Sequence, residues 1–128
     1  MERNQILYIA TTKNYSLQNK FLISGVININ LLKEQFSSYN KEKLIDDNFY
    51  YCFIFKCIDY QSLENRIYEI FGYHIDINSN ESSYHLPYNV LIKIIQFISN
   101  KYDEEIDYYY NVFFNEINEQ IHKKSIDY

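Results

Sequence analysis

The chain is poor in the residues that make turns and cross-links: its 128 residues include two Gly, one Pro and two Cys, and no Trp. With so few turn-forming residues, long regular helices and strands are expected, and Gly-rich phosphate loops such as the Walker and Rossmann motifs are excluded. A long apolar run is lacking too, because the longest, around Val90 to Ile98, is interrupted by Lys93 and Gln96. We therefore expect an intracellular protein that is neither secreted nor inserted in a membrane.

Length and composition set the size of the fold. A chain of 15.6 kDa with 47% hydrophobic residues can bury the core of one domain but not of two. Cys52 and Cys57 lie on one predicted strand, on opposite faces and about 16 Å apart, so free thiols are expected. Heavy use of Ile, Asn, Tyr, Phe and Lys with almost no Ala is typical of an AT-rich genome and indicates a viral or protist source.

Charge is distributed unevenly along the chain. Residues 1–66 carry eight Lys or Arg against seven Asp or Glu, a balance of +1, whereas residues 67–128 carry four against ten, a balance of −6. Binding to DNA phosphates normally needs a basic surface. The lysines that could form one follow the first strand or lie near the first helix: Lys13, Lys20, Lys33, Lys41 and Lys43. The alternative is that they are scattered, solubilising lysines.

The apolar pattern predicts three strands in the first half of the chain. Residues 6–12 and 21–26 read as an antiparallel hairpin, because the loop at 13–20 is too short for a crossover connection. A helix at 31–39 follows, and then a strand at 50–57. Residues 49–55 are almost continuously apolar, which predicts that either this third strand or the second one is central and covered on both faces.

Three more helices are predicted further along. Asp59 is a suitable N-cap and Gly72 a suitable stop for one helix, a polar loop follows at 78–83, and Pro87 suits the first turn of the next helix. Residues 103–128 then read as a separate amphipathic helix. It either packs on the domain formed by residues 1–102 or joins a homodimer or a protein partner through Ile106, Tyr110, Phe113 and Ile117.

This order of elements, together with Tyr8 on the first strand and Glu64 early in the second helix, resembles the GIY-YIG nuclease superfamily, in particular its short domains from phages and large DNA viruses. The resemblance implies an α/β (α+β) fold with a small three-stranded antiparallel sheet flanked by helices, to which the C-terminal amphipathic helix would be an addition. It also implies metal-dependent cleavage of DNA. Glu64 would hold Mg²⁺, Tyr8 would help to activate water, and an Arg on the first helix would neutralise the phosphate.

Several residues depart from the superfamily pattern. Phe21 stands in place of the second Tyr and lacks its hydroxyl, and Gln35 occupies the position of the Arg and lacks its charge. Ile6 and Ser24 replace two glycines. Arg66 or a lysine would have to supply the missing charge.

Two classes of function follow, and a third ranks below both. The preferred hypothesis is a degenerate module that binds DNA weakly and without sequence preference, or binds a protein, and that has no nuclease activity. The alternative is an active endonuclease that depends on Mg²⁺. The third is a structural, homo-oligomeric viral protein. If the source is viral, we expect the protein in the cytoplasm or nucleus of a host cell.

Overall fold

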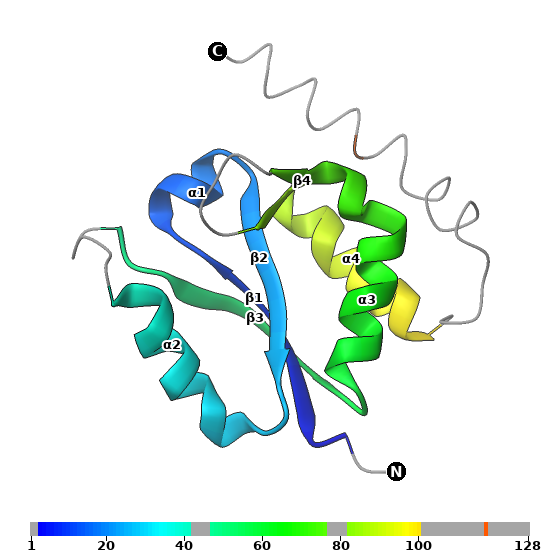
Figure 1. Ribbon diagram of the computed structural model, residues 1–128. Helices are drawn as coiled ribbons and strands as arrows, with labels where there is room; N and C mark the ends of the chain where they lie inside the picture. The colour runs from blue at the N-terminus through cyan, green and yellow to red at the C-terminus, as the bar shows by residue number, and fades with distance from the viewer. Residues whose placement is uncertain (1–2, 42–46, 77–81, 101–116, 118–128) are drawn as a thin grey trace.

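The computed structural model describes residues 3–41, 47–76, 82–100 and Ile117 (Figure 1). Its centre is a five-stranded sheet in the order β3-β1-β2-β5-β4, in which each described pair of neighbours is antiparallel. The strands are β1 (Gln5–Thr11), β2 (Lys20–Val26), β3 (Tyr50–Cys57), β4 (Ile75–Asp76) and β5 (Ser83–His85). The α+β class and the antiparallel hairpin predicted from sequence are thus confirmed.

A short helix connects the two strands of the hairpin. This helix, α1 (Lys13–Leu17), begins after Thr12, whose side chain accepts a hydrogen bond from the Tyr15 amide. Asn19 then adopts a positive φ of 56°, a conformation that Asn tolerates better than most residues, and its carbonyl accepts from the Leu86 amide. The turn before β2 therefore also holds the segment that leads from β5 to the last described helix.

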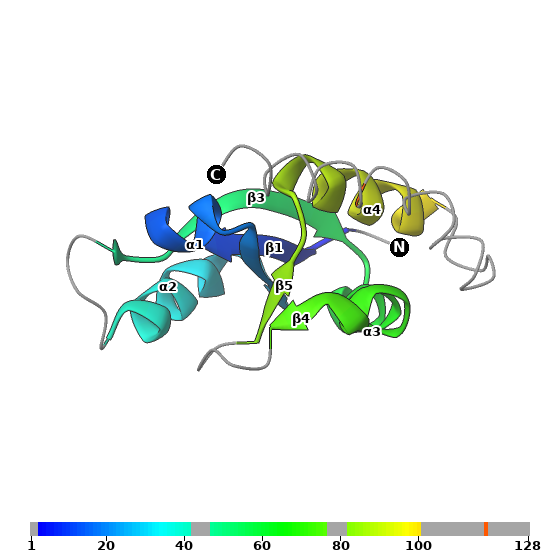
Figure 2. The same ribbon diagram turned by 90° about the horizontal axis from the view of Figure 1, so that it is seen from above.

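The remaining helices cover the two faces of the sheet. Figure 1 shows α2 (Leu32–Asn40), which follows the 3-10 turn η1 (Ile29–Leu31), on one side of the sheet, and α3 (Tyr60–Phe71) and α4 (Tyr88–Asn100) on the other. We call these the α2 side and the α3/α4 side. In Figure 2, seen from above, β1 and β3 lie between α2 and α4.

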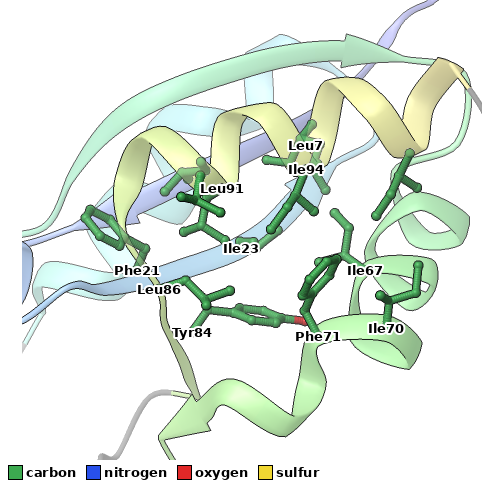
Figure 3. Packing of buried hydrophobic residues seen from close by; sticks show 14 of the residues in the cluster. Leu7, Phe21, Ile23, Ile67, Ile70, Phe71, Tyr84, Leu86, Leu91 and Ile94 are labelled. Atoms are coloured by element: carbon green, nitrogen blue, oxygen red, sulfur yellow. The ribbon is translucent and has the colours of Figure 1, made fainter. Parts of the chain in front are cut away.

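The helix boundaries agree with the capping signals in the sequence. The Asp59 side chain accepts hydrogen bonds from the amides of Gln61 and Ser62 at the start of α3, and Gly72 is the C-cap before the 3-10 turn η3 (Gly72–His74). The Pro87 carbonyl accepts from two amides in the first turn of α4. Both helices bury an apolar stripe against the sheet, as Figure 3 shows for Ile67, Ile70, Leu91 and Ile94.

The predicted number of strands is wrong. The sheet has five strands and not three; β4 and β5 contain only two and three residues, which is too few to show a pattern in the sequence. Of the two strands proposed as central, β2 is in the middle of the order, whereas β3 lies at the edge next to β1. The apolar run in β3 reflects partial cover of both its faces, since Phe53 and Phe55 pack on the α3/α4 side and Tyr51 packs on the α2 side.

A β-bulge corrects the predicted placement of the cysteines. Ile9 lies opposite Phe53 and Ala10 opposite Tyr51, so Cys52 is an extra residue in β3. The extra residue reverses the alternation, and Cys52 and Cys57 both pack on the α3/α4 side instead of on opposite faces. Both are free thiols, as expected. Burial raises the pKa of Cys52 to about 11, so its thiol stays protonated at neutral pH.

Some predictions fall outside the described residues. These are the C-terminal helix at 103–128, except for Ile117, and the basic position Lys43. Ile117 is buried in the apolar cluster on the α3/α4 side. Within the described part of the chain, no helix has both the length and the apolar character that crossing a membrane requires.

Candidate functional site

The sheet separates the residues that were predicted to form one catalytic site. Tyr8 belongs to the buried cluster on the α2 side, and Gln35 lies half-buried on α2. Phe21 belongs to the cluster on the α3/α4 side, and Glu64 lies on α3. The pairing of Tyr8 with Ser24 explains the split, because Phe21 is three positions before Ser24 and must point to the opposite face. These four residues do not converge on one cleft.

Tyr8 is enclosed in an aromatic cluster on the α2 side. Its hydroxyl lies 2.5 Å from that of Tyr39, and its ring meets the Tyr51 ring edge to face with centroids 4.8 Å apart. Burial, reinforced by the neighbouring Tyr39 hydroxyl, raises the pKa of Tyr8 well above its ordinary range. A fully buried, protonated phenol with these partners is suited to packing. It has no access to a water molecule at the surface.

Glu64 does not fit the predicted magnesium site. It is half-buried on α3, and burial raises the pKa of its carboxyl, which disfavours the ionised form that binds a metal. Burial, reinforced by the charge of Glu64, also raises the pKa of Tyr84. Among the described residues, no group of three or more Asp, Glu, His or Cys side chains could hold a metal ion. We therefore derive no metal-dependent step.

Arg66 does not supply the charge that Gln35 lacks. Its guanidinium donates to the Glu69 carboxylate at 3.0 Å on the same helix. The helix α3 lies across the sheet from Gln35, so Arg66 and Gln35 belong to different surfaces.

Gly25, which follows Ser24 in β2, has a structural role. A Cβ at Gly25 would collide with the Ile6 carbonyl oxygen and the Tyr60 ring, so Gly25 allows Tyr60 to pack directly on β2.

The predicted basic residues divide into two groups. The Lys20 ammonium pairs with the Asp76 carboxylate at 2.8 Å and lies 6.0 Å from the centre of the Tyr15 ring, so it ties β2 to β4. Lys13 on α1, and Lys33 and Lys41 on and after α2, are exposed. Phe49 links α1 to α2, because its ring contacts those of Tyr15 and Tyr39.

One exposed lysine of the α2 side was missed by the sequence analysis. Lys56 lies opposite Ile6 in the pairing of β3 with β1, which places it on the α2 side at the sheet edge. The exposed apolar side chains Phe36 and Ile54 lie on the same side. We call this set the α2 surface: Lys33, Phe36, Lys41, Ile54 and Lys56. Strand alternation could have assigned Lys56 only if the bulge at Cys52 had been known.

Comparisons with known proteins find viral relatives. The chain is 32% identical over 102 residues to a putative MSV199 domain-containing protein of Invertebrate iridescent virus 6, covering 80% of this chain and 23% of the relative. It is 28% identical over 102 residues to a putative Bro-N domain-containing protein of Invertebrate iridescent virus 3, covering 80% of this chain and 24% of the relative. A putative Bro-N domain-containing protein of Invertebrate iridescent virus 6 is 31% identical over 98 residues, which cover 77% of this chain and 23% of the relative.

The chain thus spans less than a quarter of the length of these three relatives. No protein-family model matches it, and no solved structure matches it significantly. The viral relatives agree with the source that the composition indicated. None of their names refers to the GIY-YIG superfamily, so that resemblance stays a prediction from sequence.

Proposed function

We propose that the chain is a DNA-binding module that contacts phosphates through the α2 surface, weakly and without sequence preference, and that does not cleave DNA. The observation that carries the proposal is the division made by the sheet. Tyr8 and Glu64, the two residues that match the nuclease pattern, lie on opposite sides, whereas exposed lysines share the α2 side.

The charge of the described residues supports binding to an anion. They contain eight Lys or Arg and six Asp or Glu, a balance of +2, although the whole chain has a net charge of −5. The three lysines of the α2 surface share it with the exposed apolar side chains of Phe36 and Ile54, and in the sequence Glu34 and Glu42 are adjacent to Lys33 and Lys41. Few phosphate contacts give modest, salt-sensitive affinity.

The relatives support a modular role. The similarity covers 98 to 102 residues of much longer viral proteins, which is the size of one domain. Such a domain can hold a larger protein on nucleic acid without carrying any chemistry itself.

Fluorescence anisotropy with a labelled DNA duplex tests the proposal. Lys33→Glu and Lys56→Glu should each weaken binding several-fold at low salt, because each replaces an attractive charge by a repulsive one. With about three phosphate contacts, the slope of log K against log salt should be about −3. Lys93→Glu is the matched control, since Lys93 is exposed on α4, across the sheet.

Equal losses in all three variants would show that binding follows net charge and would refute a specific α2 surface. Tight, salt-resistant binding would also contradict the proposal. Absence of DNA binding even at low salt would favour the second candidate, a protein partner. The exposed apolar side chains Phe36 and Ile54 are the reason for keeping this candidate.

A further inference from the structure

A pocket of about 440 Å³ opens at one end of the sheet, away from the α2 surface. Residues from the α1 turn, from β2 and β3, and from the start of α4 line it. Figure 3 shows one of them, Phe21, beside the first turn of α4 and away from Ile67 and Phe71. The volume is in the range of pockets that hold small ligands.

Aromatic rings form the apolar part of the wall. The rings of Phe21 and Tyr88 lie 5.6 Å apart with an interplanar angle of 37°, and Tyr50 lines the same pocket with 44% of its surface exposed. The Tyr88 hydroxyl donates to the Cys52 carbonyl at 2.7 Å, and this carbonyl belongs to the extra residue of the bulge. The bulge therefore holds the Tyr88 ring in place before any ligand arrives.

Polar groups border these rings. Ser16, Asn19 and Asn89 line the pocket, and an Asn amide offers both donors and acceptors. Lys13 precedes Ser16 by three positions and is exposed, so the two side chains lie on the same face of α1. Ser16 also donates to the Lys13 carbonyl at 2.8 Å, which fixes the turn that presents the lysine.

Flat rings, amide groups and a neighbouring cation match the three parts of a nucleotide. The exposed Tyr50 ring suits stacking of a base, the amides suit the hydrogen-bonding edge of the base, and the Lys13 ammonium suits the phosphate. We propose that this pocket receives an unpaired base of a single-stranded nucleic acid. The inference rests on the proposed DNA-binding function and adds to it a second site with a different preference.

Anisotropy with labelled oligothymidylate, measured in parallel with a duplex, tests the pocket. Tyr50→Ala should weaken binding of the single strand about tenfold, because the loss of one stacking ring costs on the order of 1–3 kcal/mol. It should leave duplex binding unchanged. Tyr73→Ala is the control, because Tyr73 is 89% exposed on η3 and does not line the pocket.

An amide NMR titration with thymidine monophosphate separates the two claims. Shifts at Tyr50, Tyr88 and Asn89 that vanish in Tyr50→Ala would establish the pocket even if the duplex failed to bind, in which case only the proposed function would fall. Duplex binding with no effect of Tyr50→Ala on the single strand, and no nucleotide shifts at the pocket, would overturn the inference and leave the proposed function standing. Equal losses with Tyr73→Ala would overturn it as well.

Discussion

The two sides of the sheet are built from different chemistry. The buried cluster on the α3/α4 side is mostly Leu, Ile and Val, contributed by the sheet and both helices. The cluster on the α2 side is smaller and rich in Tyr and Phe, with hydroxyl groups that bond to each other or to the backbone. Three exposed lysines, Lys33, Lys41 and Lys56, lie on the α2 side, whereas the described residues of α3 and α4 include one, Lys93. The α3/α4 side thus contributes more of the buried apolar core, and the α2 side presents more of the exposed lysines.

The aromatic side depends on directed contacts more than on buried area. Tyr51 donates to the Leu32 carbonyl at 2.5 Å, at the start of α2, and burial raises its pKa to about 12. The Asn40 side chain both donates to and accepts from the backbone of Phe49. These contacts hold the two ends of α2 in place, although Leu32 is the only buried residue of α2.

The largest effect should follow from a cavity on the α3/α4 side. Ile94 is fully buried, so Ile94→Ala should lower the free energy of unfolding by about 2–5 kcal/mol. Leu32→Ala should cost less, because Leu32 retains 9% exposure and belongs to the smaller cluster. Urea denaturation monitored by circular dichroism gives both values, with Lys93→Ala as the exposed control on α4. Equal losses for Ile94→Ala and Leu32→Ala would break the contrast between the two sides.

A smaller loss should follow from removing one hydroxyl on the α2 side. Tyr8→Phe keeps the ring and deletes the bond to Tyr39, so it should lower the free energy of unfolding by about 1 kcal/mol. The Tyr39 hydroxyl is only half-buried and can turn to water. The same denaturation experiment measures the change, and Tyr73→Phe is the exposed control. A gain in stability would show that the two hydroxyls strain the cluster.

Glu64→Gln should raise stability slightly, and only above acidic pH. Burial raises the pKa of Glu64 in the folded state, so the folded protein binds the proton more tightly than the unfolded chain does. The ionised carboxylate therefore costs stability at neutral pH. This cost fades as the pH falls through the folded pKa and is gone below the unfolded value. Thermal unfolding at pH 7 and at pH 3.5 should show a higher midpoint for the variant at pH 7 alone. A lower midpoint at pH 7 would mean that the charge has a stabilising partner.

Substitution of Glu64 should have no measurable effect on DNA cleavage. Because Tyr8 and Glu64 lie on opposite sides of the sheet, neither Mg²⁺ nor Mn²⁺ should support plasmid nicking. Glu64→Ala should therefore match the unaltered chain. Nicking that Glu64→Ala abolishes would restore the endonuclease hypothesis, whereas nicking that persists in the variant would indicate a contaminating nuclease.

The sequence predicted the elements whose signals are local. The hairpin was predicted from two apolar runs and the short loop between them, α3 from Asp59 and Gly72, and α4 from Pro87 and its apolar stripe. The strands β4 and β5 were not predicted, because two or three residues show no hydrophobic pattern and the pairing of β5 with β2 is long-range. The edge position of β3 could not be predicted, because an edge strand covered by apolar side chains on both faces has the same continuous apolar sequence as a central strand.

The candidate site was predicted less well than the fold. Strand alternation reveals that neighbouring residues point to opposite faces, but the face on which α3 packs is decided by tertiary structure. The strand pattern alone therefore does not reveal that Tyr8 and Glu64 lie on different sides of the sheet. The role of Lys20 changed for a similar reason, since its partner Asp76 lies on a strand that the sequence did not predict.

The central claim is that DNA meets the α2 side, and an amide NMR titration with a short duplex at low salt tests it directly. We predict shifts along α2 and at Ile54 and Lys56 on β3, with none at Lys93 on α4 or Tyr68 on α3, and we predict that the shifts disappear as salt is raised. Shifts concentrated on α3 and the middle of α4, or no shifts at any salt concentration, would contradict the account.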